Sequence, residues 1–174
     1  FLIPRAERTI AIELDARLAA RLRTRFSSVE VVEADVLETD LGQWGPAVVA
    51  GNLPYYITSP ILERLCALGP LLVRAVVLMQ REVAERLVAL PGTRDYGFLT
   101  VATQLFTEPE LLFRVPPEAF SPPPKVESAA VRLTPRRPPV ADPRRFLEFA
   151  GRCFRHKRKT LRNSLSSGLK ISTQ

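Results

Sequence analysis

Apolar and polar positions alternate along the first 90 residues in a repeating order of short apolar runs and longer segments of helical spacing. Short β-rich runs bounded by turn residues predict strands, and apolar positions three or four residues apart predict helices. The predicted strands lie in RTIAIELD, VEVVEAD, PAVVAGNLP and RAVVLMQ, and the predicted helices in DARLAARLRTRF, SPILERLCAL and REVAERLVAL. Asp15 is a predicted N-cap, and Ser59 opens the second helix with Pro60 at its first position. This alternation predicts βαβ units and a mostly parallel sheet.

The pattern changes after Tyr96. It predicts a helix through GFLTVATQLF, a strand near ELLFRV, the proline-rich turn SPPPK and a strand in SAAVRLTP. Two late strands joined this tightly predict an antiparallel hairpin that closes the sheet edge. RRPPVADP then has the composition of a linker. Residues 143–169 have the composition of a basic helical segment. We therefore predict one domain over residues 1–135 and a basic helical segment over 136–174.

The composition excludes several classes of protein. With 174 residues, 46% of them hydrophobic and 25% charged, the chain has the profile of a soluble globular domain. Its longest uncharged stretch, 41–62, contains three prolines and three glycines, which argues against a membrane span. Cys66 and Cys153 are far apart, which favours a reduced, cytosolic setting. His156 is the only histidine, so a zinc site or a Ser-His-Asp triad has little to be built from.

The charge is concentrated at one end of the chain. Residues 136–174 contain eleven Lys or Arg against two acids, a local charge of +9, although the whole chain carries only +7. Such asymmetry points to a nucleic-acid backbone or an anionic surface, with a solvated charged helix as the alternative.

Three polar residues follow the predicted strands. Glu13, Asp35 and Asn52 each stand at the carboxyl end of a successive strand, so we expect all three side chains at one rim of the sheet, where nucleotides bind. An acid at such a position can accept hydrogen bonds from ribose hydroxyls or from an adenine amine. Each carboxylate alone is more often a capping or solvated group, and it is their joint placement with Asn52 that favours a ligand site. The loop GNLPYY after the third strand can be a simple strand terminus or a platform for a base.

Four separated segments, GNLPYYITSPIL, QREVAERL, FSPPPKVESAAVRL and KRKTLRNSL, together resemble the ribosomal RNA adenine N6-dimethyltransferase family, in particular the branch that modifies small-subunit rRNA. The resemblance covers nearly the whole chain. It implies an α/β fold with the Rossmann-like sheet of S-adenosylmethionine-dependent methyltransferases. It also implies methyl transfer from S-adenosylmethionine, without a metal, to N6 of two adjacent adenosines in the 3'-terminal hairpin loop of small-subunit rRNA.

The resemblance also implies roles for individual residues. Glu13 becomes the ligand of the cofactor ribose, Asp35 the partner of its adenine amine, and Asn52 a further cofactor contact. The residues that receive the target base become Asn52, Leu53, Pro54, Tyr55 and Phe120. RNA contacts are implied in CFRHKRKTLRNSL, which has six basic residues in thirteen when His156 is counted. The residues implied in these RNA contacts are Arg155, Lys157, Arg158, Lys159 and Arg162.

The loop chemistry follows from the weakness of the nucleophile. The N6 lone pair of adenine is delocalised into the ring, so the amino group has to be held in a productive orientation. The Asn52 amide oxygen and the Leu53 carbonyl can each accept one N6–H, and Pro54 restrains Leu53 to an extended backbone. Tyr55 and Phe120 can clamp the base, with about 1–3 kcal/mol of stacking per base. Direct displacement of this kind relies on positioning and electrostatics.

The chain departs from the family at both ends. It has no glycine-rich loop after a first strand, and little follows KRKTLRNSL, so we interpret it as a fragment without the first strand and most of the C-terminal domain. The expected partner is small-subunit rRNA in a pre-30S particle, with no membrane contact, and the protein is expected to be a cytoplasmic monomer. Two alternatives stay open: a large-subunit rRNA adenine N6-methyltransferase that confers macrolide resistance, and a non-catalytic RNA-binding ribosome assembly factor.

Overall fold

The computed structural model describes residues 3–155 and 161. The chain divides into two compact units, Phe1–Trp44 and Gly45–Gln174, and each is described here by itself. The predicted continuation of the last helix to residue 169 falls on 156–160 and 162–169, outside the described residues.

The first unit is a single βαβ motif. It contains β1 (Thr9–Glu13), α1 (Ala16–Arg25) and β2 (Val29–Glu33). The strands pair in parallel, from Thr9 opposite Val29 to Glu13 opposite Glu33. Asp15 caps α1 as predicted, because its Oδ1 accepts hydrogen bonds from the Arg17 and Leu18 amides at 2.8 and 3.2 Å. Among the described residues of this unit, only Ala19 is a fully buried hydrophobic residue.

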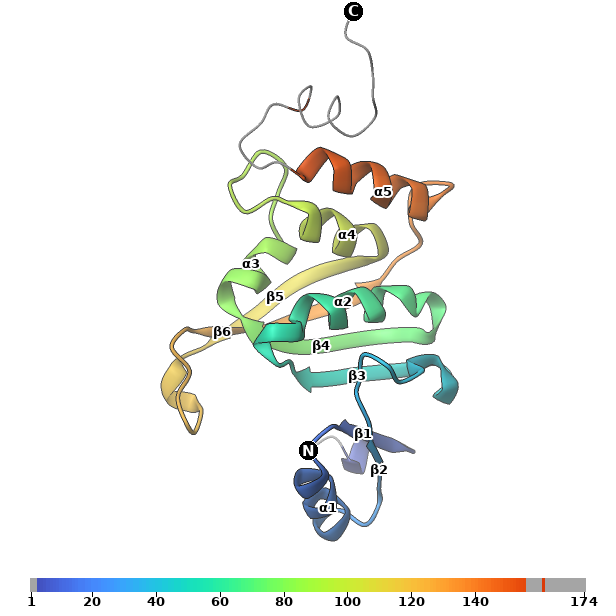
Figure 1. The fold of residues 1–174 in the computed structure, drawn as a ribbon, viewed down its shortest axis with the longest axis vertical. Helices are drawn as coiled ribbons and strands as arrows, with labels where there is room; N and C mark the ends of the chain where they lie inside the picture. The colour runs from blue at the N-terminus through green and yellow to red at the C-terminus, as the bar shows by residue number, and fades with distance from the viewer. Residues whose placement is uncertain (1–2, 156–160, 162–174) are drawn as a thin grey trace, which may run out of the picture. The chain divides into compact units, whose positions relative to one another are not determined.

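The second unit is built on a four-stranded sheet, whose strands are labelled in Figure 1. Its elements are β3 (Ala47–Asn52), α2 (Thr58–Ala67), β4 (Leu72–Gln80), α3 (Arg81–Leu87), α4 (Phe98–Phe106), β5 (Thr107–Val115), β6 (Ser128–Pro135) and α5 (Pro143–Phe154). The strand order is β3-β4-β6-β5. β3 and β4 are parallel, whereas β6 is antiparallel to both β4 and β5. The predicted antiparallel hairpin at the sheet edge is confirmed.

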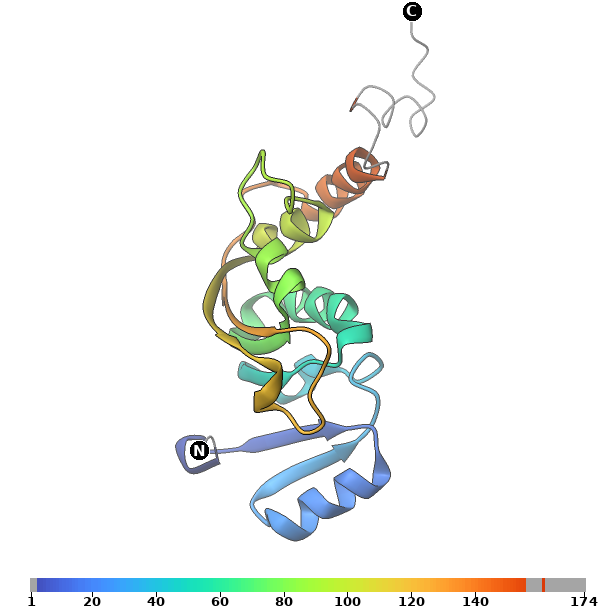
Figure 2. The same ribbon diagram turned by 90° about the vertical axis from the view of Figure 1, so that its left-hand side faces the viewer.

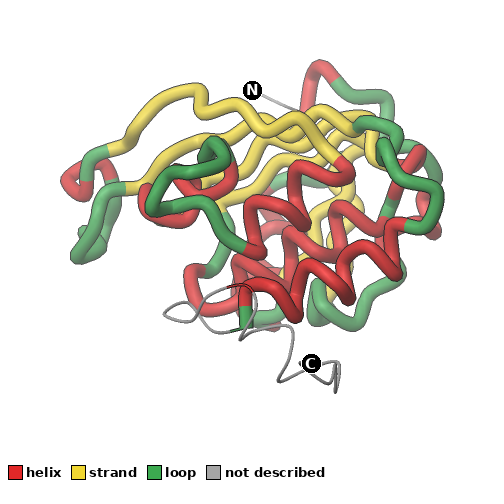
Figure 3. The backbone as a smooth tube through the Cα atoms, turned by 90° about the horizontal axis from the view of Figure 1, so that it is seen from above, coloured by secondary structure: helices red, strands yellow, loops and turns green. Residues whose placement is uncertain are grey.

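The helices of this unit lie on one side of its sheet (Figure 3). Ala75, Val77 and Met79 alternate along β4 and are fully buried. Alternation of this kind directs one set of side chains to the covered face of a strand. α5 packs on α4, and the rings of Tyr96 and Phe154 stand 6.0 Å apart at this contact. The core of the second unit is therefore much larger than that of the first.

Several predicted details are wrong although the α/β class is confirmed. Two of the four described strand pairs are antiparallel, because β6 lies between β4 and β5, so the strands are not mostly parallel. β2 ends at Glu33, so Asp35 lies two residues beyond the strand. α2 begins at Thr58 rather than after Ser59, because a 3-10 turn over Tyr55–Ile57 runs directly into it.

Two further boundaries differ from those predicted. α3 ends at Leu87 instead of continuing to residue 90. β5 begins at Thr107, immediately after α4, rather than near residue 110. No helix among residues 3–155 and 161 is long and apolar enough to cross a membrane.

Candidate active site

The loop after β3 has a firmly held backbone. The Leu53 amide donates to the Leu78 carbonyl of β4 at 2.8 Å, which extends the strand pairing past Asn52. The Pro54 carbonyl accepts from the Ile57 amide at 3.1 Å and from the Thr58 hydroxyl at 3.0 Å. The Leu53 side chain is 8% exposed, so it packs into the core below the loop. The loop is consequently anchored at both ends of its sharp turn.

Two polar groups of this loop remain open. Asn52 is exposed at the last position of β3. Within the described part of the chain, neither its amide nor the Leu53 carbonyl has a hydrogen-bond partner. A fixed backbone with unused acceptors on two consecutive residues is suited to binding an amino group. The predicted role of Asn52 and Leu53 in holding an adenine amine stays a prediction.

Tyr55, which follows β3, contacts a residue of β6, two strands away in the sheet. The Tyr55 hydroxyl lies 2.7 Å from the hydroxyl of Ser128, which is the first residue of β6. Ser128 is completely buried and Tyr55 half-buried. Ser128 was not predicted from the sequence. Its signal is a single hydroxyl at the head of the otherwise apolar run SAAV, directly after the proline-rich turn.

Phe120 lies on the connection between β5 and β6, at the end of a 3-10 turn over Pro117–Ala119. It is half-buried, and its amide donates to the Pro117 carbonyl at 3.1 Å. Figure 2 looks onto this side of the second unit, with the β5–β6 connection in front. Between described residues the one aromatic pair in contact is Tyr96 with Phe154, so Tyr55 and Phe120 do not stack on each other. Their predicted clamp on a base stays a prediction.

Glu13 and Asp35 belong to the first unit, at the carboxyl edge of its two strands. Glu13 Oε1 accepts from the Asp15 amide at 2.9 Å, and Asp35 Oδ1 accepts from the Leu37 amide at 2.7 Å. Both residues are half-buried. Each carboxylate thus uses one oxygen in a local turn, and among the described residues the other oxygen has no partner.

The open carboxylate oxygens of Glu13 and Asp35 are acceptors that fit the hydroxyl and amine donors of the adenosine part of S-adenosylmethionine. A carboxylate offers about four acceptor positions, so the contact from Asp15 leaves Glu13 enough for a ribose diol. Asp35 retains one oxygen, which is enough for an adenine amine. That these two residues and Asn52 form one rim, as the sequence predicted, stays a prediction.

Only the beginning of the predicted RNA-binding segment is described. Arg155 is exposed directly after α5, whose Arg144, Arg145 and Arg152 are exposed as well. Lys157, Arg158, Lys159 and Arg162 lie outside the described residues. Their RNA contacts stay a prediction.

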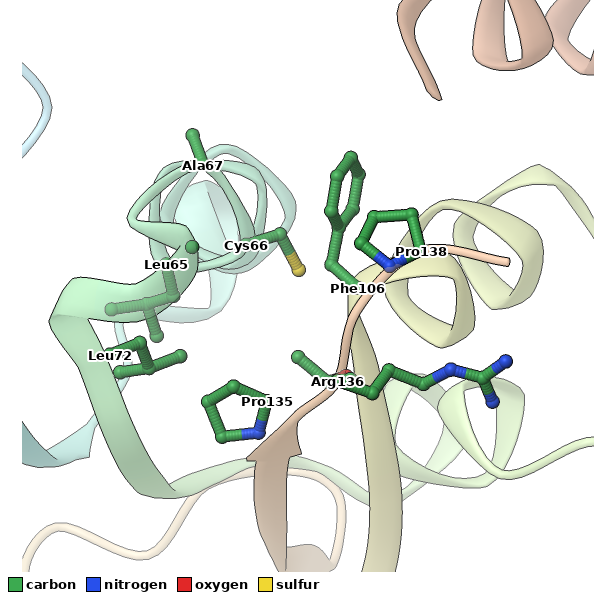
Figure 4. A pocket seen from close by; sticks show the side chains of 10 residues that line it. Leu65, Cys66, Ala67, Leu72, Phe106, Pro135, Arg136 and Pro138 are labelled. Atoms are coloured by element: carbon green, nitrogen blue, oxygen red, sulfur yellow. The ribbon is translucent and has the colours of Figure 1, made fainter. Parts of the chain in front are cut away.

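A small cavity lies at the other end of the sheet from the loop after β3 (Figure 4). Its volume is about 220 Å³, and it is lined mainly by apolar groups such as Leu72, Phe106 and Pro135, with the Cys66 thiol. Ligand pockets usually measure about 300–1,000 Å³, so this cavity is too small for a nucleoside-sized ligand. Among the described residues, no group of three or more His, Cys, Asp or Glu could hold a metal ion.

The chain is similar to named relatives. It is 51% identical over 171 residues to the Ribosomal RNA small subunit methyltransferase A of Acidobacterium capsulatum, covering 92% of this chain and 60% of that protein. It is 43% identical over 166 residues to the protein of the same name from Prosthecochloris aestuarii, covering 93% and 64%. The chain therefore spans less than two thirds of the length of these relatives.

Two solved structures share its fold. A dimethyladenosine transferase from Plasmodium falciparum matches with a TM-score of 0.80 and 32% identity, over 95% of this chain and 62% of that one. The 23S rRNA methyltransferase ErmE matches with a TM-score of 0.75 and 32% identity, over 96% and 69%. These likenesses confirm the Rossmann-like methyltransferase fold. A family model described as ribosomal RNA adenine dimethylase matches residues 2–173, and the chain belongs to this family.

Proposed function

We propose that the protein transfers methyl groups from S-adenosylmethionine to N6 of two adjacent adenosines in the 3'-terminal hairpin loop of small-subunit rRNA. Membership of the ribosomal RNA adenine dimethylase family supports the reaction class. The names of the two bacterial relatives support the small subunit as the source of the substrate.

The observation that carries the proposal is the pair of open acceptors at the end of β3. The Asn52 amide oxygen and the Leu53 carbonyl accept the two N6 hydrogens of the target adenine, which draws the nitrogen toward a pyramidal geometry and leaves its lone pair less delocalised into the ring. Pro54, with φ −60° and ψ 127°, keeps the backbone beyond Leu53 extended. No side chain has to form a covalent bond, because orientation of the amino group is the main requirement.

S-adenosylmethionine supplies an electrophilic methyl group on sulfur when it is bound. Glu13 holds the ribose hydroxyls and Asp35 the adenine amine, each with the carboxylate oxygen that its local turn leaves open. We assign to Asn52 contacts with both the cofactor and the target base. Tyr55 and Phe120 stack on the target base, which has to leave its own stack to reach them.

The substrate is an RNA, and we assign the positive charge of residues 136–174 to its backbone. This segment is proposed as a separate functional part after a methyltransferase part at 1–135. Unpaired loops are the usual targets of base-specific RNA recognition. The proposed partner is thus a pre-30S particle, and the proposed state is a cytoplasmic monomer.

A second candidate is methylation of large-subunit rRNA, because ErmE is a structural neighbour. The relatives at 51% and 43% identity favour the small subunit over it. A non-catalytic assembly factor is the third candidate, and the intact Asn52, Tyr55 and Phe120 argue against that role.

Primer extension on rRNA tests all three candidates. Dimethylated adenine blocks reverse transcriptase, so a strain that lacks the gene should lose two adjacent stops in the small-subunit hairpin loop. The gene should restore them, and the same gene with Asn52→Ala should not. Loss of a stop in large-subunit rRNA would favour the second candidate, and unchanged stops in both rRNAs the third.

A further inference from the structure

We propose that Ser128 is a positioning residue for Tyr55, and this inference rests on the proposed function. The two hydroxyls are 2.7 Å apart and join residues that are 73 positions apart in the sequence. The Ser128 hydroxyl sets the orientation of the Tyr55 ring, and through it the orientation of the stacked adenine.

Ser128 is well suited to this role because its own position is fixed from both sides. It is completely buried at the head of β6, where it pairs with Gln80 of β4 and Val115 of β5. A buried residue that is paired with a strand on each side has little freedom to move. A hydrogen bond from such a residue therefore transmits the geometry of the sheet to the loop.

Contacts of charged residues also hold the chain in place just before Ser128. The Arg81 amide donates to the Glu127 carbonyl at 2.9 Å, and the Arg81 guanidinium forms an ion pair with the Glu127 carboxylate. Glu85 lies 3.6 Å from Arg81 and 3.0 Å from Arg114. Exposed ion pairs are individually weak. Together, however, these contacts link the residue before Ser128 to α3 and β5.

The backbone of the Tyr55 loop is anchored at Leu53 and Pro54, so the hydroxyl contact fixes the free end of the ring. Without it, the ring can still offer a face for stacking, but its tilt is no longer defined. Small errors in the position of a reacting group cost large factors in rate. We therefore expect loss of the contact to lower kcat while KM for RNA changes little, since phosphate contacts dominate RNA affinity.

Steady-state kinetics of the full-length protein test this expectation. Ser128→Ala and Tyr55→Phe should each lower kcat about 10-fold, and the double variant should be no slower than the slower single variant. Ser128→Thr, which keeps the hydroxyl, should recover most of the rate. Thr134→Ala removes an exposed hydroxyl at the other end of β6 and is the matched control. Losses that multiply in the double variant, or a normal kcat in Ser128→Ala, would overturn the proposal.

A readout without methyl transfer separates this inference from the proposed function. The chain has three tyrosines. In a tyrosine-labelled sample, NMR should show a slowly exchanging Tyr55 hydroxyl proton that disappears in Ser128→Ala. When RNA with 2-aminopurine at the target position is bound, the fluorescence of this base should be quenched less uniformly by that variant than by the wild-type protein. If the wild-type protein transfers no methyl group, the proposed function fails. An unchanged Tyr55 spectrum and unchanged quenching in Ser128→Ala would overturn the role of Ser128.

Discussion

The Asn52 amide is exposed and has no partner among the described residues, so its removal should affect chemistry and not folding. We expect Asn52→Ala in the full-length protein to lower methyl transfer by at least about 100-fold, as for other groups that orient or stabilise a reacting centre. Cofactor affinity should fall only moderately. Radioactive methyl transfer and calorimetric titration measure the two effects.

Two variants serve as controls for Asn52. Asn52→Gln keeps the amide but displaces it, and should stay impaired. Gln43→Ala removes another exposed amide and should stay active. Near-normal turnover in Asn52→Ala would refute the role assigned to this residue.

Cys66 gives a pH-dependent contribution to stability. Burial, with a smaller effect from the Glu63 charge, raises the pKa of its thiol from 9.0 to about 12. Above pH 9 the unfolded chain releases this proton while the folded chain keeps it. The unfolded state is therefore favoured by up to about 1.4 kcal/mol per pH unit between pH 9 and 12.

The measurement is a comparison of urea unfolding for the wild-type protein and Cys66→Ala. The difference in their free energies of unfolding should be constant below pH 8.5 and shrink as pH rises above 9. A difference that stays constant to pH 11 would show that the thiol ionises normally in the fold.

A buried hydroxyl helps to join α3 to α4. Thr100 is completely buried, and its Oγ1 donates to the Arg86 carbonyl at 2.7 Å and accepts from the Gly97 amide at 3.0 Å. Thr100→Val keeps the volume but leaves both backbone groups without this partner. We expect a loss of about 1–3 kcal/mol in the free energy of unfolding, measured in urea. Thr100→Ser should lose less, and equal losses in both variants would contradict this account.

The basic segment provides a second test at the level of elements. Replacing Lys157, Arg158 and Lys159 together with Ala should weaken RNA binding and reduce its salt dependence by at most about three units of slope. The matched control replaces the exposed Arg17, Arg21 and Arg25 of α1. Filter binding over a range of salt concentrations measures both slopes, and equal slopes for wild type and the first variant would favour a merely solvated segment.

Local patterns predicted most elements because the signals for a strand or a helix lie within the element itself. The Asp15 cap and the end of β3 at Asn52 are of this kind. The start of α2 was missed because a 3-10 turn and a helix share the same backbone region, so the boundary carries no residue signal. Ser128 was missed because its partner Tyr55 is distant in the sequence, and no spacing rule links them.

At the scale of the whole molecule, the two units differ in the size of their cores. The first has Ala19 as its single fully buried hydrophobic residue among those described, whereas four of the nine residues of β4 and five of the eight residues of β6 in the second are buried. Local opening follows the amount of buried apolar contact. We expect amides of β1 and β2 to exchange with deuterium at least about 100-fold faster than those of β4. Exchange at one common rate in both units would indicate a single cooperative structure.

The strand order of the second unit has a consequence for synthesis on the ribosome. β5 is made before β6, yet β6 is its one partner among the described strands, and Tyr55 is made 73 residues before Ser128. At about 5–20 residues per second, the nascent loop waits roughly 4–15 s for its anchor. β5 emerges during this interval with an unpaired edge. The loop after β3 therefore gains its anchor on β6 only after the intervening strands and helices have been made.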